Sequence, residues 1–197
     1  MSKLDILFQA LSEAKKLTGH TEYVIVGSLS ALVHEESGRL PRDMVRSNDF
    51  DAYTRADPGR ILDVAHALGE GSAFFEDHDM YIDPVTPKLL TLPDGWEERM
   101  GVIEREGIKA FFLDADDAAI SKYTRGAPND LRWIRAGVET GLINLETVRD
   151  RLKTTSFLDA AEDAATKARV IEDMRTHLQT KDPSDKPPTK ALGPRRR

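Results

Sequence analysis

Val24-Ile25-Val26-Gly27-Ser28 and, further along, Asp49-Phe50-Asp51 are the two most informative segments of this sequence. The apolar run predicts a short buried strand that ends in Gly-Ser, and a helix is predicted to begin at the serine. Side chains alternate between the two faces of a strand, so the two aspartates are expected on one face and the phenylalanine on the other. The sequence therefore predicts a sheet on which two carboxylates lie close together.

The residue types in these segments indicate a site for a divalent cation and a phosphate. Two neighbouring carboxylates repel each other unless a cation lies between them. Oxygen ligands on a short strand suit Mg²⁺ or Mn²⁺, and Mg²⁺ is usually bound together with substrate phosphates. Gly27 allows a ligand to approach the backbone, and the free N–H groups of a helix that begins at Ser28 favour a phosphate. The pattern is typical of phosphoryl or nucleotidyl transfer.

These residues resemble the signature of the nucleotidyltransferase superfamily, which has the polymerase-beta-like fold. That signature places Gly-Ser at the start of a helix and Asp-x-Asp on the next strand. Here the two parts are Gly27-Ser28 and Asp49-Phe50-Asp51, separated by about twenty residues. The gap is longer than in compact members because of the loop 36–42, and surface loops tolerate such insertions.

Two later segments are similar to a bacterial branch of this superfamily. They are Leu92–Arg99 and Ser121–Gly126, the second followed by Asp130. Members of the branch are small nucleotidyltransferase-like proteins related to the toxins of abortive-infection toxin–antitoxin pairs. The resemblance covers about residues 1 to 155.

The resemblance implies a role for each residue of the signature. Asp49 and Asp51 would hold Mg²⁺, or Mn²⁺, which bridges the phosphates of a nucleoside triphosphate (NTP) substrate. Ser28 and the backbone of Gly27 would bind a terminal phosphate. For the aspartates, a solvated turn is the alternative, because Ser47-Asn48-Asp49 has the composition of one.

On the helical side, the resemblance implies that Lys122 reaches the triphosphate, with Arg125 close by. An ordinary exposed helix lysine is the alternative for Lys122. Asp130 corresponds to the acid that follows this lysine in the toxin-like branch, where it binds the substrate or acts as a base. Its alternative is structural, because an acid in the first turn after Pro128 interacts favourably with the helix dipole.

A third carboxylate normally completes such a site from a neighbouring strand. Asp83, in Met80-Tyr81-Ile82-Asp83-Pro84, is the leading candidate, as a metal ligand and as the group that activates the attacking hydroxyl. Asp79 is the second candidate, ahead of Asp77 and Glu76. If no third acid is present, the site would bind nucleotide without catalysing transfer.

The hydrophobic periodicity predicts an α+β fold, a nucleotidyltransferase-like mixed sheet flanked by helices, with a helical C-terminal part. Helices are predicted over 4–17, 28–35, 58–69, 116–123, 128–139, 145–152 and 159–178. Strands are predicted over 23–26, 49–53, 73–75 and 80–82, followed by a hairpin of 102–104 and 108–113.

These elements divide the chain into three predicted parts. Residues 1–113 form the nucleotidyltransferase-like α/β core, and 114–179 form a helical C-terminal subdomain. Residues 180–197 are rich in Pro, Lys, Asp and Ser, a composition that predicts a disordered tail.

Composition excludes several classes of site. The 197 residues contain no cysteine, which excludes disulfides, thiolate zinc sites and a cysteine nucleophile. No apolar run reaches membrane-spanning length and the N-terminus lacks a signal-peptide pattern, so a cytoplasmic protein with no membrane partner is expected. A net charge of −6 argues against a broad nucleic-acid-binding surface.

Two functional hypotheses remain. The first is a Mg²⁺-dependent nucleotidyltransferase that moves a nucleotidyl group from an NTP to tRNA, another RNA or a protein. The resemblance implies that it acts as the toxin of a bacterial toxin–antitoxin or phage-defence system, with an antitoxin protein as partner. The alternative is a catalytically silent nucleotidyltransferase-fold module that binds a nucleotide or a partner.

Overall fold

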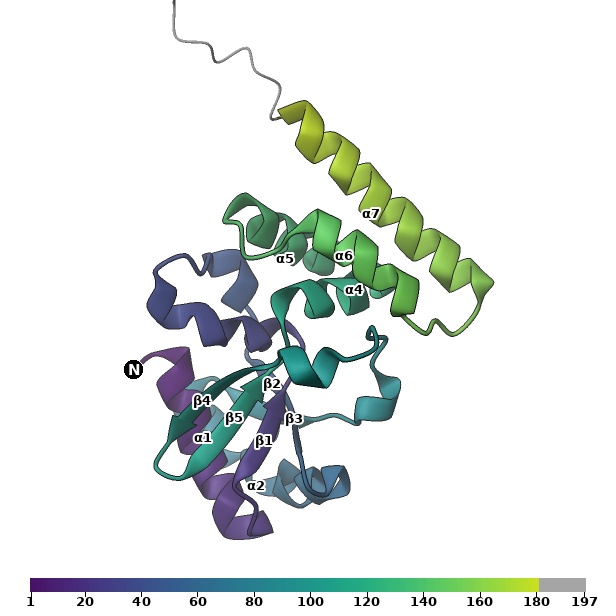
Figure 1. Cartoon of the computed structure of the whole chain (residues 1–197). Helices are drawn as coiled ribbons and strands as arrows, with labels where there is room; N and C mark the ends of the chain where they lie inside the picture. The colour runs from purple at the N-terminus through teal and green to yellow at the C-terminus, as the bar shows by residue number, and fades with distance from the viewer. Residues whose placement is uncertain (181–197) are drawn as a thin grey trace, which may run out of the picture.

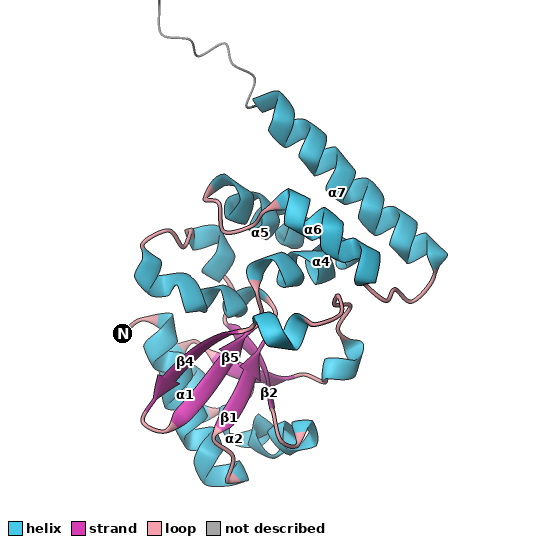
Figure 2. Ribbon diagram, in the orientation of Figure 1, coloured by secondary structure: helices cyan, strands magenta, loops and turns pink. Residues whose placement is uncertain are grey.

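A five-stranded mixed sheet forms the centre of the protein in a computed structural model, which describes residues 1–180 (Figure 2). Its order is β3-β2-β1-β5-β4, with β1 parallel to β5, β2 parallel to β3, and antiparallel pairing at β1–β2 and β4–β5. The strands are β1 (Glu22–Ile25), β2 (Asp49–Thr54), β3 (Tyr81–Pro84), β4 (Gly101–Arg105) and β5 (Ile108–Phe112). This mixed sheet with flanking helices is the predicted α+β fold.

Helix α1 (Lys3–Thr18) packs against the sheet and the segment that follows β2. It begins with a capping box, in which Ser2 and Asp5 satisfy each other's backbone N–H groups. Its apolar stripe is buried and consists of Leu4, Leu7, Leu11 and Ala14. The helix ends at Gly19, which adopts the left-handed conformation common at helix C-termini.

Short helical segments connect the strands. The 3-10 helices are η1 (Ser28–Ser37), η2 (Arg42–Val45), η3 (Pro58–Val64), η4 (Pro87–Leu89) and η5 (Trp96–Arg99), and two short α-helices, α2 (Ala65–Leu68) and α3 (Ala73–His78), lie between β2 and β3. The segment predicted as a helix from Ser28 is therefore helical, with the tighter 3-10 geometry.

The C-terminal part is helical, as the sequence predicts (Figure 1). It comprises α4 (Ala115–Arg125), α5 (Pro128–Glu139), α6 (Leu145–Arg151), η6 (Leu152–Thr154) and α7 (Ala160–Thr180). Helix α4 contacts α5, α6 and α7, and also η1 of the first part. Among the helices of residues 1–180, none has both the length and the apolar composition needed to cross a membrane.

The strand predicted over 73–75 is wrong, because these residues belong to helix α3. The Ser72 side chain accepts a hydrogen bond from the backbone N–H of Phe75 at 3.2 Å and so caps the helix. This cap outweighs the strand preference of the two phenylalanines. Asp77 and His78 lie in the last turn of the same helix.

The other predicted strands and the hairpin are confirmed, each within a few residues of its predicted ends. Helix α7 extends to Thr180, one residue past the predicted boundary of the helical part, whereas the rest of the predicted tail, 181–197, lies outside the described residues.

A buried ion network joins α4 to its neighbours. The side chain of Asp117 is fully buried and accepts two hydrogen bonds from Arg99, at 2.9 and 3.2 Å. Arg151 of α6 donates a third, at 2.8 Å. A carboxylate buried in this way is stable only while its cationic partners remain in place. The network therefore fixes α4 relative to α6 and to the segment before β4.

We expect Asp117→Ala to lower the free energy of unfolding by about 3 kcal/mol, because two arginines lose their buried partner. Urea denaturation followed by circular dichroism measures this. The matched control is Asp150→Ala, which removes an exposed carboxylate that pairs with Lys153 and should leave the urea midpoint almost unchanged. Equal losses in the two variants would contradict the role of the buried network.

Candidate functional site

Three carboxylates converge where β2 and β3 lie side by side. Asp49, Asp51 and Asp83 each place an oxygen within 4.8 Å of the others. The parallel register explains this, because Asp51 lies directly opposite Asp83, and Asp49 lies two residues earlier on the same face. Phe50 and Ile82 point to the other face and are buried in the core. The geometry suits a divalent cation with carboxylate ligands.

The environment of Asp51 favours a bound cation. Burial, together with the negative charges of Asp49 and Asp83, raises the pKa of its carboxyl to about 7, and Lys122 and Arg125 oppose this rise only in part. Burial and the charges of Asp49 and Glu70 likewise raise the pKa of Asp83. A divalent cation bound between these three acids would offset the repulsion between their negative charges.

The remaining acids near β3 have other roles. Asp79 ends α3 in the left-handed conformation, and its carboxylate accepts a hydrogen bond from Asn48 at 3.2 Å. Asp77 and Glu76 lie within α3. Of the four candidates from the sequence, Asp83 is the one that the structure places beside Asp49 and Asp51.

The start of β2 is held by its own hydrogen bonds. The Ser47 hydroxyl donates to the carboxylate of Asp49. Lys3, at the start of α1, donates to the backbone carbonyl of Ser47. These contacts link the first helix to the first of the three carboxylates, and nothing in the local sequence of either residue indicated this link.

Gly27 lies so close to Asp51 that only glycine fits. Its φ of 63° and ψ of −150° belong to a region that is essentially restricted to glycine. A Cβ atom built there would lie 1.7 Å from Oδ2 of Asp51. The turn between β1 and η1 therefore passes directly beside the carboxylate site, as expected where a phosphate and a metal ion meet.

Ser28 is connected to α4 and α5 by two hydrogen bonds. Lys122 Nζ donates to Ser28 Oγ at 2.9 Å, and Trp133 Nε1 donates to the Ser28 carbonyl at 3.1 Å. Trp133 also donates to the carbonyl of Met44 at 3.0 Å. The tryptophan is buried, and Lys122 Nζ lies 4.8 Å from its ring centroid. Helices α4 and α5 thus place a lysine on the serine of the Gly-Ser turn.

Asp130 holds two cations together. Lys122 donates to its Oδ1 at 3.2 Å, and Arg125 donates to both oxygens, at 2.9 and 2.5 Å. Lys122 and Asp130 are only 3% and 4% exposed. Lys122 is therefore not the exposed helix lysine of the alternative interpretation. Asp130 does lie in the first turn of α5, so its position also suits the helix dipole.

The pKa values of Asp130 and Lys122 are shifted because one carboxylate contacts the two cations Lys122 and Arg125 in a partly buried place. Burial opposes ionisation of Asp130, but the hydrogen bond from Arg125 and the charge of Lys122 outweigh it and lower the pKa of the carboxyl. Burial lowers the pKa of Lys122, and the Asp130 charge offsets this only in part. Asp130 is thus an ionised acceptor whose oxygens are already occupied.

Helix α7 secures the end of α4 that carries Lys122 and Arg125. Arg169 donates to the backbone carbonyls of Tyr123 and Thr124, at 2.7 and 3.2 Å. The buried Tyr123 hydroxyl donates to Asp173 at 2.9 Å. These bonds satisfy carbonyl groups that a helix C-terminus leaves without partners.

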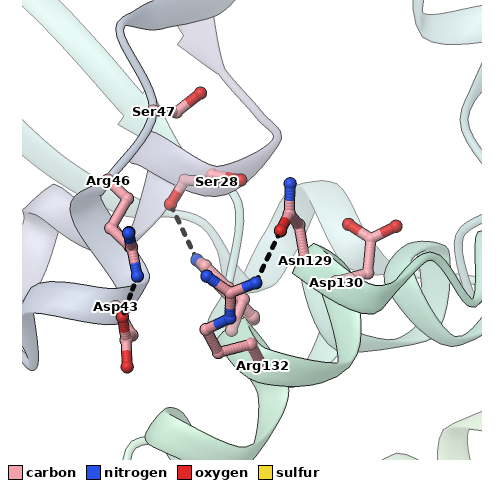
Figure 3. A pocket seen from close by; sticks show the side chains of 8 residues that line it. Ser28, Asp43, Arg46, Ser47, Asn129, Asp130 and Arg132 are labelled. Carbon is pink, nitrogen blue, oxygen red and sulfur yellow. Dashed lines mark hydrogen bonds and ion pairs between the residues drawn. The ribbon is translucent and has the colours of Figure 1, made fainter.

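A cavity of about 310 Å³ lies beside this cluster, between the η1–η2 region and α5 (Figure 3). Ser28 and Asp130 belong to the predicted site, and they share the cavity with residues that the sequence analysis did not assign to it. Those residues are Asp43, Arg46, Ser47, Asn129, Arg132 and Trp133. No sequence signal pointed to them as a group, because they come from separate segments.

The sequence pattern of one protein family covers almost the whole chain. Residues 4–179 match the family described as "Nucleotidyltransferase of unknown function (DUF6036)". The chain belongs to this nucleotidyltransferase family. No curated protein and no solved structure is significantly similar to it. Membership agrees with the resemblance drawn from Gly27-Ser28 and Asp49-Phe50-Asp51, and it extends that resemblance through α7.

We expect Gly27→Ala to destabilise this nucleotidyltransferase by about 2 kcal/mol more than Gly107→Ala, because the added methyl group meets Asp51. Gly107 is the comparison, since it also has a positive φ, of 70°, while nothing lies within 4 Å of its Cβ position. Thermal denaturation of both variants measures the difference. Equal destabilisation of Gly27→Ala and Gly107→Ala would show that the contact with Asp51 does not contribute to the loss of stability.

The raised pKa of Asp51 predicts a pH-dependent response to Mg²⁺. The unfolded chain ionises Asp51 near its ordinary pKa of about 4, so the metal-free protein loses stability as the pH rises from there towards about 7. Added Mg²⁺ should therefore raise the melting temperature more at pH 8 than at pH 5.5, because it competes with the proton at low pH.

Asp51→Asn is the test of this interpretation, because it removes the charge and keeps the shape. Without metal at pH 8 the variant should be more stable than the parent protein by on the order of 1 kcal/mol. Its melting temperature should no longer respond to Mg²⁺ at either pH. The same Mg²⁺ response in variant and parent would show that Asp51 is not a ligand.

Proposed function

We propose that the chain transfers a nucleotidyl group from an NTP to a hydroxyl group of an RNA or protein acceptor. One observation carries the proposal, the position of Asp83 opposite Asp51 in the parallel register of β2 and β3. It supplies the third carboxylate that a transferase site needs and that a pure binding module does not. Asp49 and the Gly27-Ser28 turn lie in the same place, which supports one common site.

Asp49, Asp51 and Asp83 would hold Mg²⁺, or Mn²⁺, because their oxygens are within reach of one ion and oppose each other's ionisation. When bound, the cation neutralises negative charge on the phosphates and in the transition state. Lys122 reaches the same region from α4, through Ser28, and adds a positive charge for the triphosphate. Arg125 is partly exposed beside it and acts in the same way.

In the reaction, the acceptor hydroxyl oxygen attacks the α-phosphorus and forms the new P–O bond. The bond between the α-phosphorus and the oxygen that leads to the β-phosphate breaks, and pyrophosphate leaves with the electron pair. The hydroxyl proton passes to Asp83, the most exposed of the three acids, and then to water.

Asp130 has a positioning role in this proposal. Its carboxylate is buried, ionised and occupied by Lys122 and Arg125, so it has little capacity to accept a substrate proton. By holding the two cations it fixes their direction towards Ser28 and the carboxylates. We therefore assign the proton-accepting role to Asp83 and the positioning role to Asp130.

The resemblance to the toxin-like branch suggests a biological role for the proposed transfer. It supports an acceptor of the tRNA, RNA or protein class, a role as the toxin of a bacterial toxin–antitoxin or phage-defence system, and an antitoxin protein as partner.

We expect the purified protein to transfer label from an α-³²P-labelled NTP to a component of a total RNA and protein extract when Mg²⁺ is present. Asp49→Asn and Asp51→Asn should each reduce the transfer at least about a hundredfold, because the triphosphate charge is then no longer neutralised. Gel electrophoresis after nuclease or protease treatment identifies the class of acceptor.

Asp63→Asn is the matched control, because Asp63 is an exposed acid paired with Arg60 and lies outside the site. It should transfer label at the parental rate. Mg²⁺-dependent binding of an NTP without transfer to any acceptor would instead favour the catalytically silent module. Transfer that survives both substitutions in the site would overturn the proposal.

A further inference from the structure

The cavity beside Ser28 has a chemical character that the proposed site does not yet explain. Its lining consists of hydroxyl, amide, carboxylate and guanidinium groups, with Trp133 as the one apolar contributor among the described lining residues. Figure 3 shows Arg46 and Arg132 on opposite sides of the space below Ser28, one from the end of η2 and one from α5. Two arginines facing a shared space are suited to an anion.

The charges in the cavity leave positive potential available. Asp130 is already neutralised by Lys122 and Arg125. Arg46 pairs with Asp43 at 3.1 Å, but both side chains are largely exposed, so the pair is weak and easily exchanged. Arg132 donates to the neutral side-chain oxygen of Asn129 at 2.8 Å and has no carboxylate partner within residues 1–180.

The cavity has no surface on which a nucleobase could stack. Trp133 is 2% exposed, its Nε1 is occupied by two backbone carbonyls, and Lys122 lies over its ring. The ring is therefore not available to a base. The hydroxyl groups and guanidinium groups that remain match phosphate oxygens in hydrogen-bonding capacity.

Two serines that line the cavity also form hydrogen bonds with residues of the proposed site. Ser28 lines it and accepts a hydrogen bond from Lys122, and Ser47 lines it and donates to Asp49. A ligand whose reacting end lies at the three carboxylates can extend past these serines into the cavity. A chain of phosphates has the length, flexibility and charge to do so.

We propose that Arg46 and Arg132 bind the two terminal phosphates of the NTP, the part that leaves as pyrophosphate. This rests on the proposed function, and it names the feature of the substrate that the cavity selects, namely the polyphosphate chain. The nucleobase lies outside the cavity. Arg46 and Arg132 neutralise charge on the leaving group and distinguish a triphosphate from a monophosphate without contacting the base.

Inorganic tripolyphosphate is the probe that tests the cavity without any base or sugar. Calorimetry should show that Arg46→Gln and Arg132→Gln each weaken its binding to the full chain about tenfold, as expected for the loss of a charge-assisted hydrogen bond. Arg132→Lys should recover part of the loss, because it restores the charge without the planar fork.

Arg42→Gln and Arg135→Gln are the matched controls. Arg42 is exposed at the other end of η2, and Arg135 lies on α5 but lines a different cavity, against α7. Both should bind tripolyphosphate within twofold of the parent. All four arginines are exposed, so their substitution should leave the melting temperature unchanged. A similar loss in controls and cavity variants, or no loss in the cavity variants, would overturn the proposal.

Transfer assays on the same proteins separate this inference from the proposed function. If nucleotidyl transfer occurs and the cavity variants keep the parental KM for the NTP, the role of the cavity is wrong and the function stands. If tripolyphosphate binding depends on Arg46 and Arg132 but the parent transfers no nucleotide, the cavity assignment stands and the proposed function is wrong.

Discussion

The close approach of the Gly27 backbone to Asp51 is the constraint around which the site is arranged. A side chain at position 27 would occupy the space of the Asp51 carboxylate. The backbone at this point also takes a conformation that glycine alone adopts readily. Because that space is free, the Gly-Ser turn that follows β1 lies beside the carboxylates of β2. Strand β3 runs parallel to β2 and places Asp83 opposite Asp51.

Electrostatics divides the site into two halves. The carboxylates of β2 and β3 repel one another and are suited to a cation, whereas the far side holds Lys122 and Arg125 on the single carboxylate of Asp130. Ser28 lies between the halves and bonds to Lys122. Helix α7 holds the end of α4 that carries Lys122 and Arg125, because Arg169 donates hydrogen bonds to the last backbone carbonyls of α4. A phosphate chain placed between the cation that these acids would hold and the basic groups of Lys122 and Arg125 would be stabilised from both sides.

What could be predicted from the sequence depended on local periodicity and on short motifs. Strand alternation placed Asp49 and Asp51 on one face. The resemblance to the superfamily called for a third acid on a neighbouring strand and so singled out Asp83, which the register of β2 and β3 brings beside them. The strand predicted over 73–75 failed because two adjacent phenylalanines suggested β-structure while Ser72 supplied a helix cap. Arg46, Asn129 and Arg132 could not be grouped in advance, because only the packing of α5 against the η1–η2 region brings them together.

The hydrogen bond between Tyr123 of α4 and Asp173 of α7 has a consequence for the chain during its synthesis. Translation delivers the Gly-Ser turn and all three acids of the sheet within the first half of the sequence, but the lysine and its counter-ion follow much later, and the helix that secures them comes last. A ribosome-bound chain therefore cannot form these contacts until α7 has emerged. Premature termination before α7 yields a product that lacks every bond between α7 and the end of α4.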